Sequence, residues 1–78
     1  MLINNDGFYY NIIRDTYESL DIYYSRAWFI VKLKPRNLIE LNNFIHYSFL
    51  WVNIKYKKCI YSKNIHDKIN ELEFKITI

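Results

Sequence analysis

Two strand-like segments on either side of one helical segment restrict the fold more than any other feature of this chain. Residues 27–34 form a run of β-branched and aromatic side chains that stops at Pro35, which cannot donate a hydrogen bond to a β-ladder. Residues 52–61 begin with alternating apolar and polar side chains, a pattern typical of a strand with one buried face. If these strands are parallel neighbours in one sheet, their connection should be right-handed, with the helix covering one face.

The segment between the two strands has the signals of a helix. Asn37 is followed three residues later by Glu40, which is the spacing of an N-cap residue and its partner. Apolar side chains then recur at intervals of three and four residues, which places them on one helical face. We therefore predict a main helix over about residues 37–51. Its apolar positions are Leu38, Leu41, Ile45, Phe49 and Val52.

The N-terminal residues predict two smaller elements. Residues 7–13 are rich in aromatic and β-branched side chains, which favours a short strand. Asp15 and Glu18 have the spacing of a capping box, which favours a second short helix over about residues 15–25. A hairpin through residues 21–26 is the alternative for that region.

The C-terminal residues predict one more strand. Residues 72–78 alternate without interruption, and residues 62–70 form a link with room for a helical turn. The inward side chains of this strand would be Leu72, Phe74, Ile76 and Ile78. The predicted fold class is α+β, with a small three- or four-stranded mixed sheet packed by one main helix. We expect residues 1–78 to form a single compact domain.

The composition favours a folded, soluble chain with a thin but aromatic core. Two Trp, eight Tyr and five Phe supply enough apolar surface to exclude intrinsic disorder. No apolar run approaches the roughly 20 residues that cross a bilayer, and the first residues lack a signal-peptide pattern, so we expect no membrane partner. Cys59 is the only cysteine, which excludes an intramolecular disulfide. It favours a reducing, cytoplasmic setting, with an organelle as the alternative.

Positive charge is concentrated in the middle of the chain. Residues 26–63 contain eight lysines and arginines and a single acid, whereas residues 1–25 contain four acids and one arginine. In the predicted sheet, lysines at alternate positions of the two central strands point away from the helix, and such a surface attracts an anionic partner. The candidate binding residues on and around this face are Trp28, Lys32, Lys34, Arg36, Asn53, Lys55, Lys57 and Tyr61.

A cationic face with aromatic side chains suits single-stranded nucleic acid, because lysines follow the phosphates while flat rings stack on bases. We therefore predict binding to RNA, to single-stranded DNA or to a nucleoprotein complex. Two alternatives remain open. The lysines can simply keep an exposed sheet face in solvent. They can also meet an acidic protein surface. As a different function, the chain can be an inhibitor or adaptor that docks a partner through its aromatic surface, and a homodimer is compatible with this.

No pattern of catalytic or metal-ligating residues is specific enough to predict an enzyme. His46 and His66 lack the spacing of a zinc site, and the single glycine excludes a Gly-rich phosphate loop. His66–Asp67 and Glu73–Lys75 are short matches to hydrolase and nuclease motifs whose other residues are missing. We expect a non-enzymatic binding protein with no metal and no cofactor. Its abundance of Ile, Asn, Lys and Tyr, which have AT-rich codons, suits an accessory protein of a phage or virus.

Overall fold

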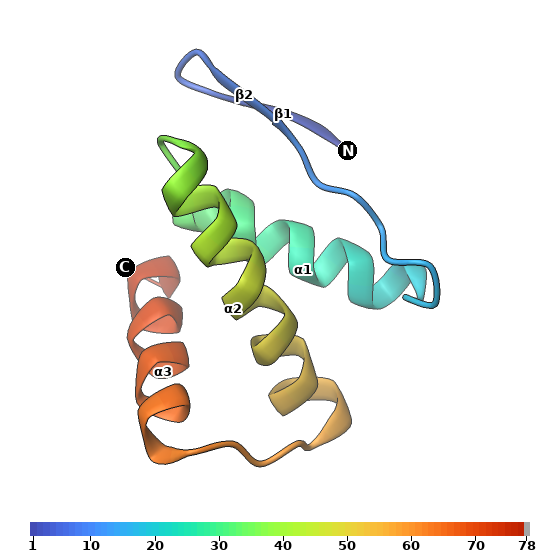
Figure 1. Cartoon of the computed structure of the whole chain (residues 1–78), viewed down its shortest axis with the longest axis vertical. Coiled ribbons are helices and arrows are strands. Elements are labelled where there is room, and N and C mark those ends of the chain that lie inside the picture. The colour runs from blue at the N-terminus through green and yellow to red at the C-terminus, as the bar shows by residue number, and fades with distance from the viewer. Residues whose placement is uncertain (78) are drawn as a thin grey trace.

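The computed structural model describes residues 1–77, which form a β-hairpin followed by three helices (Figure 1). The elements are β1 (Leu2–Asn5), β2 (Phe8–Asn11), α1 (Leu20–Leu33), α2 (Leu38–Lys57) and α3 (Lys63–Thr77). The predicted α+β class is confirmed. Within the described residues, however, the sheet has two antiparallel strands instead of three or four. The same residues contain three helices, whereas one main helix and a second short helix were predicted.

The hairpin forms at the dipeptide Asp6–Gly7. Both residues have positive φ angles, 51° and 89°, as the type I′ turn of a two-residue hairpin requires. The turn sets a register in which Ile3 pairs with Tyr10, and both side chains pack toward the helices. The strand predicted over residues 7–13 is therefore correct in its centre, as β2, whereas β1 was not predicted.

Tyr10 has a buried hydroxyl with no hydrogen-bond partner among residues 1–77. Burial raises the pKa of the Tyr10 phenol above its usual value of 10.0. Tyr10→Phe removes the unpaired group and should raise the free energy of unfolding by about 1–2 kcal/mol in urea denaturation. The gain should grow above pH 10, because Tyr10 ionises more easily in the unfolded parent than in the folded one. A variant less stable than the parent would show that the hydroxyl has a partner.

Residues 27–34 were predicted as a strand, but residues 27–33 belong to helix α1 and Lys34 caps its C-terminal end. Ser19 caps the start of this helix, and its Oγ accepts a hydrogen bond from the Ile22 amide at 3.3 Å. The helix is buried on two sides, against the hairpin and part of α2 on one and against α2 and α3 on the other. Its apolar run is therefore nearly continuous, and such a run does not distinguish a buried helix from a buried strand. The helix ends at Leu33 and is followed by Lys34, which has a left-handed backbone with a φ of 54°.

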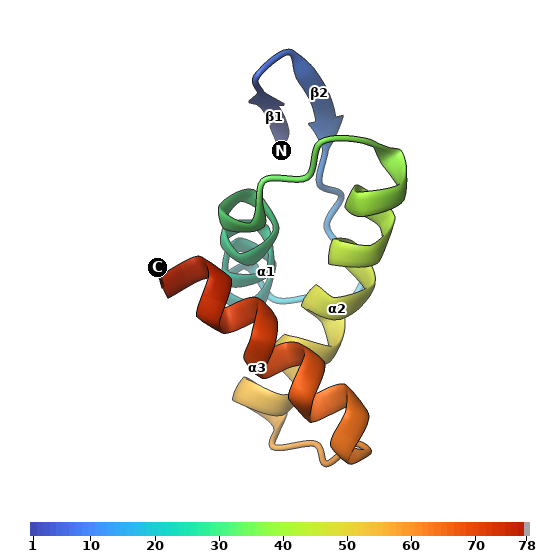
Figure 2. The ribbon, with the colours of Figure 1, turned by 90° about the vertical axis from the view of Figure 1, so that its left-hand side faces the viewer.

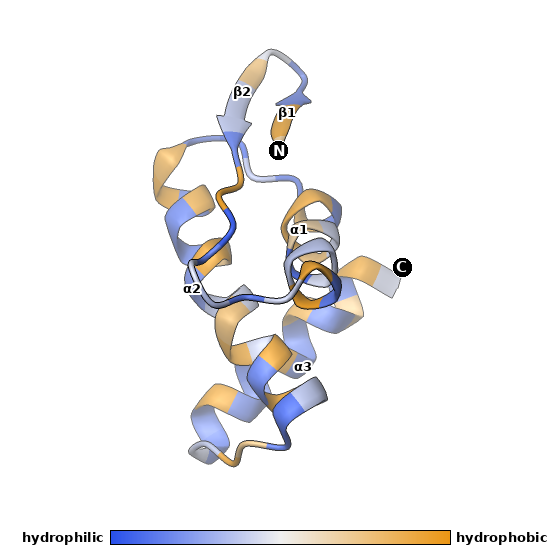
Figure 3. Ribbon diagram, turned by 90° about the vertical axis from the view of Figure 1, so that its right-hand side faces the viewer, coloured by the Kyte–Doolittle hydropathy of each residue, from blue (hydrophilic) through white to orange (hydrophobic). Residues whose placement is uncertain are grey.

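The short helix predicted over residues 15–25 is correct only where it overlaps α1. Asp15 and Glu18 do bond to each other: the Asp15 amide donates to the Glu18 carboxylate at 3.2 Å, and the Glu18 amide donates to the Asp15 carbonyl at 3.1 Å. These bonds close a single turn within residues 12–19, which connect the hairpin to α1 (Figure 3). The alternative hairpin through residues 21–26 is wrong, because those residues are helical.

The main helix predicted over residues 37–51 is confirmed as α2, although it continues to Lys57. The Asn37 Oδ1 accepts a hydrogen bond from the Glu40 amide at 2.9 Å, which is the predicted cap. The strand predicted over residues 52–61 is wrong, because its first part completes α2 and the rest forms the connection to α3. Lysines are favourable in the last turn of a helix, so the alternation of apolar residues and lysines fits a helix end as well as a strand.

The apolar face predicted for α2 is partly correct. Leu41 and Val52 are buried, Ile45 and Phe49 are half-buried, and Leu38 is 65% exposed. Leu38 is the first residue of the helix and lies at the edge of the packed surface.

The final strand predicted over residues 72–78 is also wrong as far as residue 77, because these residues belong to α3. Leu72 and Ile76 are one helical turn apart and both pack inward, whereas Phe74 is 65% exposed. Positions that are four residues apart lie on one face of a helix and also on one face of a strand, so the apolar residues at 72 and 76 fitted both structures. The predicted inward position of Ile78 lies outside the described residues.

Two apolar clusters connect the elements. One lies between the hairpin, α1 and α2, and the other lies between the three helices. In the second cluster Phe29 stacks on Trp51 with their ring centroids 4.7 Å apart. Figure 2 shows α3 lying across both α1 and α2. None of the helices described over residues 1–77 has the length and apolarity to span a membrane.

Candidate functional site

The four lysines predicted to share a sheet face are on helix ends instead, and the structure separates them. Lys32 and Lys34 are at the C-terminal end of α1, whereas Lys55 and Lys57 are in the last turn of α2. The two pairs line different surface depressions. The predicted basic sheet face is therefore wrong, because neither segment forms a strand: residues 27–33 and 52–57 are helical.

The end of α1 and the loop before α2 do bring cationic side chains together. Lys32, Lys34 and Arg36, three of the predicted residues, line one depression with Lys75 of α3. We call these four residues the basic cluster. Its lining also includes apolar side chains from α1 and α2 and one acid, Glu40. Lys75 was missed because the final segment was predicted to be a strand.

The backbone that carries the basic cluster is held in place. The Pro35 carbonyl accepts a hydrogen bond from the Asn5 side chain of the hairpin at 2.9 Å. The Arg36 amide donates to the Glu40 carboxylate at 2.9 Å. The N-terminal end of α2 follows directly, and this end of a helix carries a partial positive charge. Lys34 and Arg36 therefore extend from an ordered loop at the start of α2.

Three of the four cationic groups in the basic cluster form no direct ion pair with an acid among residues 1–77. Among residues 1–77, no carboxylate lies within 4.0 Å of the charged groups of Lys32, Lys34 and Arg36. Lys75 lies 3.8 Å from Glu71 across one turn of α3, and this pair is exposed to solvent. Exposed pairs of this kind are weak. The basic cluster can therefore accept an anion.

A row of exposed, mostly aromatic side chains follows α1. Leu20, Tyr24 and Trp28 recur every four residues and are 51%, 55% and 47% exposed. Tyr56 of α2 lies beside them, since its hydroxyl oxygen is 3.0 Å from Ser25 Oγ. We call Leu20, Tyr24, Trp28 and Tyr56 the aromatic stripe. Of these four residues, only Trp28 was predicted to be a binding residue. The four-residue spacing could not be recognised, because half of α1 was assigned to a strand.

Trp28 and Lys55 meet in a second depression, beside the last turn of α3. The Trp28 ring centroid is 6.0 Å from that of Trp51, and Lys55 Nζ is 5.1 Å from the Trp51 centroid. The Trp51 indole N–H donates to the Glu73 carboxylate at 2.7 Å. Lys55 therefore lies over an aromatic ring and near an acid, and this makes it a weaker phosphate ligand than the basic cluster.

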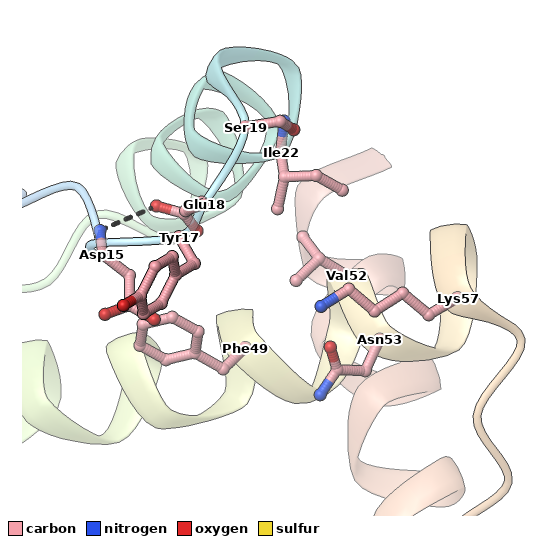
Figure 4. A pocket seen from close by; sticks show the side chains of 9 residues that line it. All are labelled: Asp15, Tyr17, Glu18, Ser19, Ile22, Phe49, Val52, Asn53 and Lys57. Carbon is pink, nitrogen blue, oxygen red and sulfur yellow. Dashed lines mark hydrogen bonds between the residues drawn. The ribbon is translucent and has the colours of Figure 1, made fainter.

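Lys57 and Asn53 line a third depression, at the start of α1 (Figure 4). Asp15 and Glu18 are also part of its lining, so its charge is mixed. The Asn53 side chain donates to the Tyr61 hydroxyl at 3.0 Å, which connects α2 to the following loop. The predicted binding residues Asn53, Lys57 and Tyr61 therefore lie apart from the basic cluster.

A buried ion pair, missed in the sequence, joins residues 12–19 to α1. Arg26 Nε and Nη2 donate to the two carboxylate oxygens of Glu18 at 2.7 and 3.0 Å, and Nη2 also donates to the Ile13 carbonyl at 2.8 Å. The Arg26 guanidinium carbon is 4.2 Å from the centroid of the Phe49 ring. Arg26 is 1% exposed and Glu18 is 9% exposed. The sequence signal was Arg26 itself, a charged residue beside a long apolar run, because a charge in such a position is buried only when it has a partner.

The environment of Glu18 keeps it ionised. Burial by itself would raise the pKa of Glu18, but hydrogen bonds from Arg26 and the Asp15 amide oppose this. With the charges of Arg26 and Arg14, they bring the pKa of Glu18 below its usual value of 4.5. Both charges of the pair are satisfied inside the protein, so the pair stabilises the fold and does not form part of a binding surface.

Among residues 1–77, no three His, Cys, Asp or Glu side chains gather as metal ligands. His66 Nε2 accepts a hydrogen bond from the Tyr61 amide at 3.1 Å, and His46 packs edge-on against Tyr47. The geometry offers surfaces for binding, and the absence of catalysis stays a prediction. Comparisons with known protein families, with curated proteins and with solved structures found no match.

Proposed function

We propose that this chain is a non-enzymatic protein that binds single-stranded nucleic acid, or a nucleoprotein, through the basic cluster. The observation that carries the proposal is the set of cationic side chains around one depression, three of which have no carboxylate within 4.0 Å of their charged groups among residues 1–77. RNA and single-stranded DNA both present the phosphates that such a cluster attracts.

The chemistry of the basic cluster suits phosphate oxygens. Arg36 has a planar guanidinium that can donate two parallel hydrogen bonds to one phosphate, and the lysines add point charges around it. The N-terminal end of α2 lies beside Arg36, but its partial positive charge is offset by the Asn37 cap and the Glu40 carboxylate, so we assign phosphate binding to the cationic side chains. Such contacts are independent of base sequence, so we expect affinity for many sequences.

The remaining parts of the sequence interpretation stay proposals as well. The skew toward AT-rich codons supports an origin in a phage or virus and a place of action inside the host cell. The alternative function, an inhibitor or adaptor, would use the aromatic stripe, because contiguous exposed apolar side chains mark protein contacts.

Replacing Lys34 and Arg36 with alanine should weaken binding to a fluorescently labelled single-stranded oligonucleotide. Each phosphate neutralised contributes about −0.7 to the slope of log affinity against log salt, so losing two contacts should flatten the slope by about 1–1.5 units. Fluorescence anisotropy at several salt concentrations measures both quantities. Lys57→Ala combined with Lys63→Ala is the matched control, because it removes the same charge far from the basic cluster.

The control separates a defined site from the general attraction of a basic protein, whose pI is about 9.0. Equal losses in the two double variants would contradict a site at the basic cluster. No binding of the parent below about 100 μM at low salt would contradict nucleic-acid binding altogether, because even non-specific binders reach that affinity. An acidic protein partner would then explain the cations better.

A further inference from the structure

The aromatic stripe has charges placed so that it is complementary to itself. Asp21 and Lys32 are both exposed and are separated by eleven residues, or about three helical turns, so they lie on the same flank of α1. Asp21 is near the start of the stripe and Lys32 is beyond its end. Among residues 1–77, neither has an oppositely charged group within 4.0 Å.

We propose that two copies of the chain associate through their aromatic stripes, with the two α1 helices antiparallel about a twofold axis. In such a pair the same flanks of the two helices meet. Tyr24 of each copy then lies against Trp28 of the other, and Asp21 of each copy lies against Lys32 of the other. A parallel arrangement would oppose like charges at both ends, which the antiparallel one avoids.

The aromatic stripe has the area and the order that a weak dimer needs. A half-exposed aromatic side chain leaves on the order of 100 Å² to be covered, so the stripe offers a few hundred Å² in each copy. That is at the low end of specific interfaces, which predicts reversible association. The contact between Ser25 Oγ and the Tyr56 hydroxyl restricts the Tyr56 ring before association, which lowers the entropic cost.

The dimer shares Lys32 with the proposed nucleic-acid site, but Lys34 and Arg36 belong to that site alone. Lys34 and Arg36 line the depressions beside the α1–α2 loop and are not part of the aromatic stripe. Their replacement with alanine should leave dimerisation unchanged. Failure of oligonucleotide binding and failure of dimerisation can therefore be observed separately.

Sedimentation equilibrium of the whole chain, from low to high micromolar concentration, tests the interface. Asp21→Lys and Lys32→Asp should each lower the association constant about tenfold, because each turns two attractive contacts into two repulsive ones. The double variant carrying both changes should restore association, since the pair is reversed but still complementary. Tyr24→Ser should abolish it, with circular dichroism and thermal melting confirming that the variants fold.

A parent that stays monomeric at high micromolar concentration would overturn the dimer. A double charge reversal that associates no better than the single variants would overturn the antiparallel arrangement. A strict monomer in which Trp28→Ala weakens oligonucleotide binding would also overturn it and would assign the aromatic stripe to base stacking.

Discussion

Replacing Arg26 with methionine is expected to lower the free energy of unfolding by about 3–5 kcal/mol. Methionine fills much of the same volume, but it leaves the Glu18 carboxylate buried without its cation and the Ile13 carbonyl without its donor. The guanidinium contact with the Phe49 ring is lost as well. A small domain has a total stability of about 5–15 kcal/mol, so this loss is a large part of it. Urea denaturation followed by circular dichroism measures the difference.

The pH dependence of stability should change sign in the same variant. In the parent, the lowered pKa of Glu18 gives a contribution that is complete above the usual value of 4.5 and is lost as the pH falls through the folded-state pKa. Without Arg26, we expect burial, the largest of the causes, to outweigh the remaining Asp15 hydrogen bond and Arg14 charge and to raise the pKa of Glu18. The variant should therefore become more stable as the pH falls from 7 toward 4.5, because protonation removes the buried charge.

Glu18→Gln combined with Arg26→Met is the matched control. Glutamine keeps an acceptor for the Asp15 amide but carries no charge, so most of the stability lost in Arg26→Met should return. The pH dependence assigned to Glu18 should disappear. An Arg26→Met variant as stable as the parent at neutral pH would contradict the buried ion pair.

The helices that carry their own boundary signals were the predictable part of this fold. α2 has a cap at Asn37 and apolar side chains on one side, and both were visible in the sequence. α1 has neighbours on two sides, so nearly all its inward positions are apolar and its period was hidden. Its one inward charge, Arg26, pairs with a residue outside the helix, which local patterns do not show.

The difference between local and long-range information also explains which site residues were correctly predicted to lie together. Lys32, Lys34 and Arg36 are close in sequence, so they stay close whether the segment is a strand or a helix. Lys55 and Lys57 depended on a second strand beside the first, and that pairing does not exist. The prediction was therefore wrong for lysines that are far apart in sequence, because it depended on the secondary structure. It was correct for cationic residues that are close in sequence.

The second large effect is expected at Phe29, at the centre of the cluster between the three helices. Its side chain is fully buried and stacks on Trp51 at a centroid distance of 4.7 Å, and buried residues of α2 and α3 complete its surroundings. Phe29→Ala should cost about 3–5 kcal/mol, because both the buried ring and its packing are lost.

Thermal and urea denaturation of Phe29→Ala should show a domain close to unfolding at room temperature, because the loss approaches the whole stability of so small a chain. Leu38→Ala is the matched control: Leu38 is apolar too but 65% exposed, so its truncation should change stability by no more than about 0.5 kcal/mol. If Phe29→Ala melted within a degree or two of the parent, the ring could not be buried between the helices. In that case residues 27–34 would present Phe29 to solvent, and the helical arrangement that places Lys32 and Lys34 beside Lys75 would be wrong.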